Sequence, residues 1–271
     1  MFDFVTDNAF NIEITNDYIL SIQVSLDGFS FSVYHSAENK ILAFQYSPIK
    51  ISSINLVSRH LQEWINSTEI FQHSFKKVSV VVFNHEFTII PELLYQNDLK
   101  KAIPDYLFEK KDNLEIAENF IEKLNARLTF VLPSGLNQVL LDFFGLYEIT
   151  HPLKLIINQL PQSYNKHAAL LLFYVDNFYA IIYNSDKILL VNNFKMGHAN
   201  DVVYFIVNAL QQLKITPLDT ELILAGSNKN TDDFSKALQP YFENVGNLKP
   251  AATIINPEIA ENSFLRYNSI I

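Results

Sequence analysis

Apolar and polar residues alternate in the N-terminal part of the chain, which is the pattern of β-strands that turn one face toward a core. Residues 18–24 carry an aromatic or aliphatic side chain at every second position, and the pair Asp27–Gly28 then forms a typical two-residue hairpin turn. The alternation resumes over residues 29–33, and residues 40–46 form a third apolar run. We therefore predict a β-hairpin followed by a third strand.

The next segment has the three-and-four spacing of an amphipathic helix. Its apolar positions are Ile54, Val57, Leu61, Trp64 and Ile65. Ser52 or Ser53 stands where a helix N-cap is expected. Residues 78–83 then form a continuous apolar run, which is typical of a strand buried on both faces. The first part of the chain is thus predicted as strand–strand–strand–helix–strand.

The same order of elements returns in the second half. The apolar runs that predict its strands cover residues 169–175, 178–183, 187–194 and 222–225. A helix is expected from about Asn200, whose side chain can cap it. Asp201 would lie in the first turn of this helix, where the helix dipole favours a carboxylate.

Seven identities align the two halves. Asp27, Phe29, Tyr34 and Ser36 match Asp176, Phe178, Tyr183 and Ser185 without a gap, and after a two-residue deletion Lys40–Ile41–Leu42 matches Lys187–Ile188–Leu189. Repetition of one supersecondary unit explains this alignment, and coincidence between two apolar hairpins is the alternative. We therefore predict an α/β protein with two similar lobes, each a mixed sheet with helices.

The segment between the repeats has a different texture. Its expected elements are strands at 87–90, 114–120, 126–132 and 147–150 and helices at 98–108, 136–144 and 152–160, although 114–124 could also be helical. Ser134 can cap the helix at 136–144, and Gly145 can end it. The polar residues 161–166 are the expected hinge. We assign residues 1–165 to a first lobe, with an inserted subdomain at about 84–150, and residues 166–271 to a second lobe.

Composition narrows the possible functions. The 271 residues include no cysteine, which excludes thiolate chemistry, and only six glycines, none spaced as GxGxxG or GxxxxGK. The net charge of −9 and the scattered Lys and Arg residues argue against a nucleic-acid partner. The longest apolar run, residues 168–175, is too short to span a membrane, and the acidic start argues against export. We expect a cytoplasmic protein without a transmembrane segment.

Motifs for metal or nucleophilic chemistry do not emerge. The seven histidines lack HxxxH and HExxH spacing, so no metal site is predicted. Ser134 lacks a GxSxG elbow, and Ser227 is better explained by a turn after Gly226. Asp27 and Asp176 lie at matching hairpin turns, and in a protein with pseudo-twofold symmetry they would face one cleft. No catalytic residue is assigned.

The order of elements resembles the actin-like ATPase superfamily, which has a duplicated, ribonuclease H-like, two-lobe fold with mixed sheets and an inserted subdomain. Three segments carry the resemblance: PSGLNQVLLDFFGLYEITHPLKLIINQL, HAALLLFYVDNFYAIIYNSDKILLVNNFKMG and LILAGSNKNTDDF. They are similar to passages of the bacterial branch that contains the pilus-assembly protein PilM and the cell-division protein FtsA. Within it, the chain resembles an uncharacterised family found mainly in Bacteroidetes.

The resemblance implies where a nucleotide would bind. In that superfamily the phosphates lie between two hairpins, one per lobe, and a Gly-rich turn of the second lobe holds the adenosine. The matching residues here are Asp27, Gly28 and Ser30 in the first hairpin, Asp176 and Asn177 in the second, and Gly226 and Ser227 in the adenosine turn. The aromatic residues Phe29, Phe178 and Tyr179 follow these turns and are expected to crowd a triphosphate. This predicts a degenerate nucleotide site.

Three hypotheses on function follow. The leading one is a non-enzymatic, actin-like scaffold or adaptor that binds a protein partner and holds no cofactor. The alternative is a nucleotide-binding ATPase or phosphotransferase, which would use ATP and Mg²⁺ with Asp27 and Asp176 as its carboxylates. A third is an unrelated α/β module that binds a small ligand in an apolar pocket.

Overall fold

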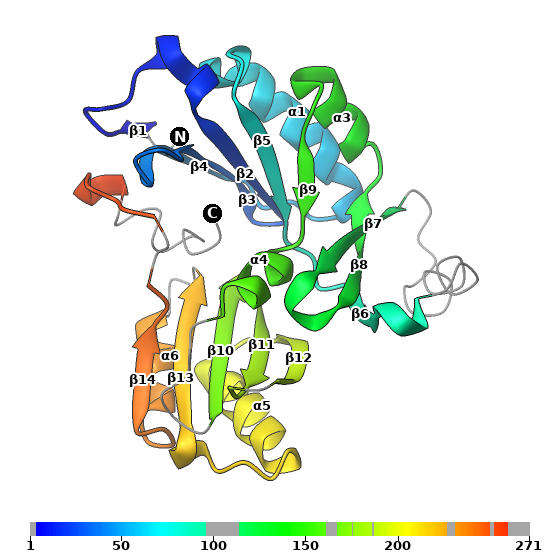
Figure 1. Ribbon diagram of the computed structural model, residues 1–271, viewed down its shortest axis with the longest axis vertical. Helices are drawn as coiled ribbons and strands as arrows, with labels where there is room; N and C mark the ends of the chain where they lie inside the picture. Colours follow the sequence, from blue (N-terminus) through cyan, green and yellow to red (C-terminus); the bar gives the residue numbers. More distant parts are fainter. Residues whose placement is uncertain are drawn as a thin grey trace. The chain divides into compact units, whose positions relative to one another are not determined.

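The computed structural model describes residues 4–95, 114–160, 167–174, 176–185, 187–226, 231–249 and 252–259 (Figure 1). Their contacts group them into two compact units. The first unit contains the described residues up to Asn158 together with residues 252–259, and the second extends from Gln159 to residue 249. The helix expected at 98–108 and the hinge expected at 161–166 lie outside the described residues.

The first unit is built on a six-stranded sheet. Its strand order is β1 (Val5–Thr6), β4 (Lys40–Pro48), β3 (Gly28–His35), β2 (Ile19–Ser25), β5 (Lys77–Val82) and β9 (Glu148–Thr150). Neighbours from β1 to β2 are antiparallel, whereas β2, β5 and β9 run parallel. Helices α1 (Val57–Ser67) and α3 (Leu136–Phe144) lie side by side (Figure 1). Helix α1, which the apolar periodicity of this segment predicts, lies in the connection from β4 to the strand β5.

The second unit repeats this plan in a five-stranded sheet. Its order is β12 (Ile188–Lys195), β11 (Asn177–Tyr183), β10 (His167–Tyr174), β13 (Thr220–Gly226) and β14 (Asn244–Asn247). The first three are antiparallel neighbours, and β10, β13 and β14 run parallel. Helices α5 (Ala199–Gln212) and α6 (Thr231–Leu238) pack on one face, where the Phe173 ring stacks on Phe234 at 4.9 Å.

The two sheets share an irregularity that supports the duplication. The β3·β4 register shifts between Val33 and Tyr34, and the β11·β12 register shifts between Ile182 and Tyr183. Past this shift, Tyr34 pairs with Ile41 in the first unit and Tyr183 pairs with Ile188 in the second. The identities aligned in the sequence thus occupy the same sheet positions, and a β-bulge of this kind is a specific feature of a strand pair. The predicted repeat is confirmed.

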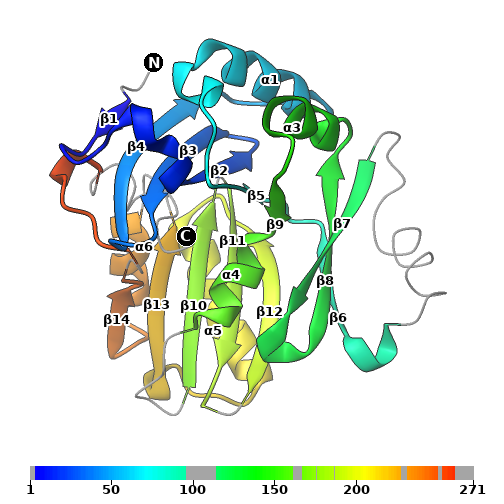
Figure 2. The same ribbon diagram turned by 45° about the horizontal axis from the view of Figure 1, so that its top comes forward.

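The inserted part forms a separate three-stranded sheet, in the order β6 (Phe87–Pro91), β8 (Ala126–Pro133) and β7 (Leu114–Ile121) (Figure 2). The strand interpretation of residues 114–120 is therefore correct and the helical alternative is wrong. Helix α3 packs on α1, and β9 pairs with β5 of the main sheet. The inserted sheet consequently ends at Pro133, before the expected limit near residue 150.

Several short helices complete the two units. They are the helix α4 (Pro152–Asn158) and the 3₁₀ turns η1 (Ile12–Asp17), η2 (Ile54–Leu56), η3 (Glu69–Gln72), η4 (Glu92–Leu94), η5 (Glu122–Leu124) and η6 (Pro217–Asp219). Within the described residues, none of the helices combines the length and apolar character that a membrane span requires.

Two predicted helix caps are wrong. Gly135, with φ +75°, occupies the N-cap of α3, while the carbonyl of Ser134 accepts a hydrogen bond from Ser58 Oγ at 2.8 Å. Helix α5 begins one residue before Asn200, and its N-cap is His198. The Asp201 carboxylate accepts the N–H groups of Gly197 and His198 at 2.7 and 2.8 Å, which lowers the pKa of Asp201. A capping box at His198 therefore replaces the simple Asn cap.

A buried histidine links the inserted sheet to the main sheet. His151 is fully buried between the rings of Phe87 and Phe130, with centroids at 5.3 and 5.1 Å. Its Nε2 lies 3.0 Å from the carbonyl oxygen of Asn84, and its Nδ1 accepts the N–H of Leu153. These partners suit the neutral ring with the proton on Nε2. Burial lowers the pKa of His151 to about 3.

The chain returns to the first unit near its end. Residues 252–259 lie beside β1 and β4 (Figures 1 and 2), where Ala252 and Ile259 pack with Val5 and Phe44. A β-bridge joins Lys40 to Thr253, and Asn256 Nδ2 donates to the carbonyl of Thr6 at 2.9 Å. Residues 252–259, which we expected in the second lobe, thus contribute to the core of the first unit.

The state of His151 predicts a pH dependence of stability. Its pKa of about 3 in the fold lies below the ordinary histidine value of 6.5, so at intermediate pH the unfolded chain binds a proton that the folded chain does not. This stabilisation is complete above pH 6.5 and is lost as the pH falls toward 3. From about pH 7 to pH 5 the loss amounts to about 2 kcal/mol. Urea unfolding at pH 7 and pH 5 measures this drop in the free energy of unfolding. His151→Gln should reduce the drop by about 2 kcal/mol, whereas His85→Gln, at an exposed position, should leave it as in the wild type.

Packing of residues 252–259 predicts a second stability effect. Ile259→Ala removes a fully buried side chain and should lower the free energy of unfolding by about 2–4 kcal/mol. Ile255→Ala, at a position 58% exposed on the same segment, should change it by about 0.5 kcal/mol or less. Equal effects of the two variants in urea unfolding would contradict the placement of this segment.

Candidate functional site

The first hairpin turn joins β2 to β3, and its polar groups bond within the unit. Ser25 Oγ donates to the Asp27 carboxylate, and it also lies 3.1 Å from the Gly28 carbonyl oxygen. The carbonyl of Asp27 accepts two hydrogen bonds, from Tyr46 Oη at 3.0 Å and from the N–H of Ile49 at 3.2 Å. Strand β4 and the residue after it therefore close over this turn.

The backbone of Ser47 to Ile49 passes so close to position 28 that only glycine fits there. The φ of Gly28, +131°, lies in a region that L side chains rarely adopt, and a Cβ there would lie 2.1 Å from the carbonyl oxygen of Ser47. This contact explains the glycine without any bound phosphate. Ser30, two residues on, is 3% exposed, and its hydroxyl donates to Gln23 Oε1.

The ring of Phe29 does not occupy the space at the turn. Phe29 is fully buried beneath α1, where it stacks on Trp64 with ring centroids 5.5 Å apart. The residue after Gly28 faces the helix-covered side because side chains alternate along β3. The expectation that Phe29 crowds a triphosphate is therefore wrong.

The second hairpin turn joins β10 to β11 and carries a directed chain of hydrogen bonds. Tyr174 Oη donates to Asn193 Oδ1 at 2.7 Å, and Asn193 Nδ2 donates to Asn177 Oδ1 at 3.1 Å. Asn177 Nδ2 then donates to the Asp176 carboxylate at 2.7 Å. Lys195 Nζ lies 3.7 Å from the same carboxylate, in an ion pair between exposed side chains. The polar side chains of this turn thus bond to one another and to β12.

The aromatic residues after the second turn are also buried. Phe178 is fully buried on the face that α5 and α6 cover, with its ring 5.7 Å from Phe173. Tyr179 lies on the opposite face, fully buried, and stacks on Tyr174 at 4.5 Å. These rings pack within their own sheet, so the expectation that they crowd the turn is wrong for Phe178 and Tyr179 as well.

Gly226 ends β13 beside β10. It pairs with Phe173, has φ +85°, and would place a Cβ 2.2 Å from the Phe173 carbonyl oxygen. The sheet therefore brings Gly226 to the same end as the turn of Asp176 and Asn177, as expected for neighbouring parallel strands. Ser227 lies outside the described residues. In the first unit, Asp27, Gly28 and Ser30 lie on a single hairpin, formed by β2 and β3.

The sequence did not identify Tyr46, Asn193 and Lys195 as partners of the two turns. Tyr46 lies on β4, and Asn193 and Lys195 lie on β12, each 19 residues or fewer along the chain from the groups it contacts. The strand register places them there, because β4 and β12 run past the tip of the preceding hairpin. If the strand after each hairpin is paired with the hairpin in the sequence, these three residues fall beside the turns.

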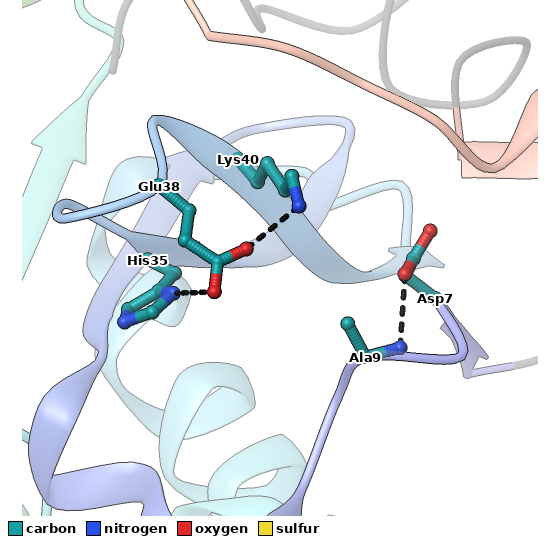
Figure 3. A network of polar contacts seen from close by, with 5 residues as sticks. All are labelled: Asp7, Ala9, His35, Glu38 and Lys40. Carbon is teal, nitrogen blue, oxygen red and sulfur yellow. Dashed lines mark hydrogen bonds and ion pairs between the residues drawn. The ribbon is translucent and has the colours of Figure 1, made fainter.

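A cluster of charges lies at the opposite end of β3, away from the turn (Figure 3). Glu38 is paired with Lys40 at 2.7 Å and with His35 at 3.4 Å. The hydrogen bond and charge of Lys40 lower the pKa of Glu38, and those of Glu38 raise the pKa of Lys40. Nearby, the Asp7 carboxylate accepts the N–H of Ala9 at 2.9 Å. These exposed contacts fix local turns.

The inserted sheet has its own network. Arg127 makes two hydrogen bonds to the Glu92 carboxylate, at 2.8 and 3.0 Å, and lies over the ring of Tyr95. In the part of the chain that is described, no group of three or more His, Asp or Glu side chains is arranged to hold a metal ion.

Comparison with known proteins gives the family. Residues 7–245 match the model of DUF3822, described as a protein of unknown function, and the chain belongs to this family. A search of curated proteins found no match. Among solved structures, the chain is similar to a Bacteroides thetaiotaomicron protein with an actin-like ATPase fold and unknown function. The TM-score is 0.80 at 19% identity over 95% of this chain and 99% of that one.

The chain is also similar to PilM in a PilM–PilN type IV pilus biogenesis complex, with a TM-score of 0.57 and 11% identity over 92% of this chain and 93% of that one. At these identities the likeness establishes the fold. The chain has the actin-like fold, so the hypothesis of an unrelated α/β module is wrong, and the predicted fold class is confirmed.

The packing at Gly226 predicts a destabilised variant. Gly226→Ala combines a strained φ with an overlap on the Phe173 backbone and should lower the free energy of unfolding by about 2 kcal/mol or more. Gly246→Ala, at a position with nothing within 4 Å of the new Cβ, is the matched control. Thermal unfolding of both variants measures the difference; similar melting temperatures would show that Gly226 is not required by packing.

Proposed function

We propose that this protein is a non-enzymatic actin-like scaffold or adaptor that binds a protein partner and does not turn over nucleotide. One observation carries the proposal: the polar side chains of both hairpin turns are hydrogen-bonded within their own units. Ser25 donates to Asp27, and the donors of Asn177 and Asn193 continue toward Asp176. The nucleotide site is in this sense degenerate.

Electrostatics supports the same proposal. A phosphate group requires several N–H or O–H donors at hydrogen-bond distance and is repelled by carboxylates. The first turn presents Asp27, whose partner hydroxyl already donates to it, and the second turn presents Asp176. The cation near Asp176 is Lys195, whose side chain is 80% exposed and paired with that carboxylate. A triphosphate would have to break these contacts before it gained any.

Similarity to PilM supports a protein partner, because that solved structure is a complex of PilM with PilN. An actin-like protein can therefore act by association. The cytoplasmic location expected from the sequence stays a prediction.

The alternative function is a nucleotide-dependent ATPase or phosphotransferase. It is favoured by the equivalent placement of Asp27 and Asp176, since each directly precedes the second strand of its hairpin, β3 or β11. Two carboxylates at such turns could hold Mg²⁺ with ATP. Asp27, Gly28, Ser30, Asp176, Asn177, Gly226 and Ser227 would be the residues nearest the nucleotide under this alternative.

Calorimetry separates the two functions. With the full chain, ATP and Mg²⁺ at millimolar concentration should give no saturable heat, and phosphate release should equal that of buffer. Micromolar binding would contradict the proposal. If turnover is found, its loss in Asp27→Asn and Asp176→Asn but not in the exposed control Asp219→Asn would establish the ATPase alternative instead.

A further inference from the structure

The first unit contains a pocket of about 410 Å³ between β4 and α1. Its floor comes from Ser47 and Ile49 on and after β4, and its opposite wall from Trp64 and Ser67 on α1. Residues of η3 and the side chain of Ile12 on η1 complete it. A volume of this size is in the range of sites for small organic molecules. All of its lining residues belong to one unit.

The walls of the pocket are apolar and aromatic. Trp64 is held in place by its stack on Phe29 and by an edge contact with Phe71 at 5.0 Å. Tyr46 is fixed by its hydrogen bond to the Asp27 carbonyl oxygen. Ile49 and Ile70 add aliphatic surface. A rigid apolar wall of this kind takes an aromatic or branched aliphatic body at little cost in side-chain entropy.

The polar groups at the α1 end of the pocket are His60 and four side chains whose oxygens can accept hydrogen bonds. Ser67 Oγ and Thr68 Oγ1 both donate to the carbonyl of Trp64, at 2.9 and 2.8 Å, so that their oxygen lone pairs remain to accept. Glu63 and Glu69 add two carboxylates. Glu63 is paired with Arg59 and His60, whereas Glu69 makes no ion pair within the described part of the chain.

The electrostatic field at this end favours a cation. Helix α1 ends at Ser67, and the C-terminus of a helix carries partial negative charge. No lysine or arginine is among the described residues that line the pocket. The imidazole of His60, which also lines this end, is paired with Glu63, so a ligand with N–H donors and positive charge suits the remaining acceptors. A carboxylate or phosphate would be repelled.

We propose that this pocket binds a small primary amine, with its ammonium group at Glu69 and the C-terminus of α1 and its apolar body against Trp64 and Ile49. The pocket shares Tyr46, Ser47 and Ile49 with the backbone that closes over the first hairpin turn, but Asp27, Gly28 and Ser30 do not line it. Its ligand class is that of arylalkyl or alkyl amines, as distinct from acids and neutral alcohols of the same shape.

Trp64 allows a direct test, since it is the only tryptophan of the chain. The probe is 2-phenylethylamine, titrated at millimolar concentration into the ¹⁵N-labelled full chain at neutral pH while the indole N–H resonance is followed. The same titration with 2-phenylethanol and 3-phenylpropanoate keeps the ring and changes the charge. We expect a saturable shift with the amine, binding weaker by about tenfold for the alcohol, and no saturation with the acid.

Two pairs of variants test whether Glu69 binds the ammonium group and whether the amine occupies this pocket. Glu69→Gln should weaken amine binding by about threefold to fivefold, as for an ion pair at an exposed rim, whereas the equally charged control Glu243→Gln should not. Ser67→Phe should fill the pocket and abolish the shift, and Asn66→Phe, one residue away outside the lining, should leave it unchanged. Circular dichroism checks that each variant folds.

Three results would overturn the proposal. They are the absence of a saturable Trp64 shift with the amine, equal affinity for the alcohol or the acid, and equal weakening by Glu69→Gln and Glu243→Gln. The first would show that the cavity holds no amine of this class, and the others that the pocket binds by apolar contact alone.

Discussion

In each unit, the strand that follows the hairpin (β4 or β12) leads into a residue whose backbone N–H stabilises the hairpin turn. The chemistry of the two turns depends on this contact. The N–H of Ile49 donates to the Asp27 carbonyl, and the N–H of Met196 donates to the Asp176 carbonyl at 2.8 Å. In the first unit the backbone passes so close that Gly28 has no room for a Cβ. In the second unit the same passage brings Asn193 and Lys195 to the turn. Each turn is thereby stabilised by its own sheet.

The two units preserve a backbone plan, while some of the side chains at their turns differ. Ser25 faces Gly28 across the first turn, and Tyr174 faces Asn177 across the second. The shared register shift before Tyr34 and Tyr183 shows that the sheets correspond residue by residue. At the turns, Asp27 and Phe29 have identical counterparts in Asp176 and Phe178, whereas Ser25 and Tyr174 differ.

Much of the fold could be predicted from the sequence, because apolar periodicity reports which face of a strand or helix is buried. The repeat, α1 and the strand at 78–83 followed directly from it. The helix caps were less predictable. Gly135 caps α3 through its left-handed backbone conformation, and His198 caps α5 through reciprocal hydrogen bonds with Asp201. Alternation along β3 and β11 places the rings of Phe29 and Phe178 toward the helices, so the loop residues alone do not predict where these rings lie. Contacts of residues 252–259 with the first unit depend on the tertiary path of the chain, which local patterns do not encode.

The proposed lack of nucleotide binding depends on the hydrogen bonds that the two turns make within their own units. Its most direct test is an NMR titration of the ¹⁵N-labelled chain with ATP and Mg²⁺, which follows the backbone amide of Gly28 and the side-chain amide of Asn177. Against a control of matched ionic strength, we expect both resonances to stay in place. Saturable shifts of both at the same nucleotide concentration would contradict it.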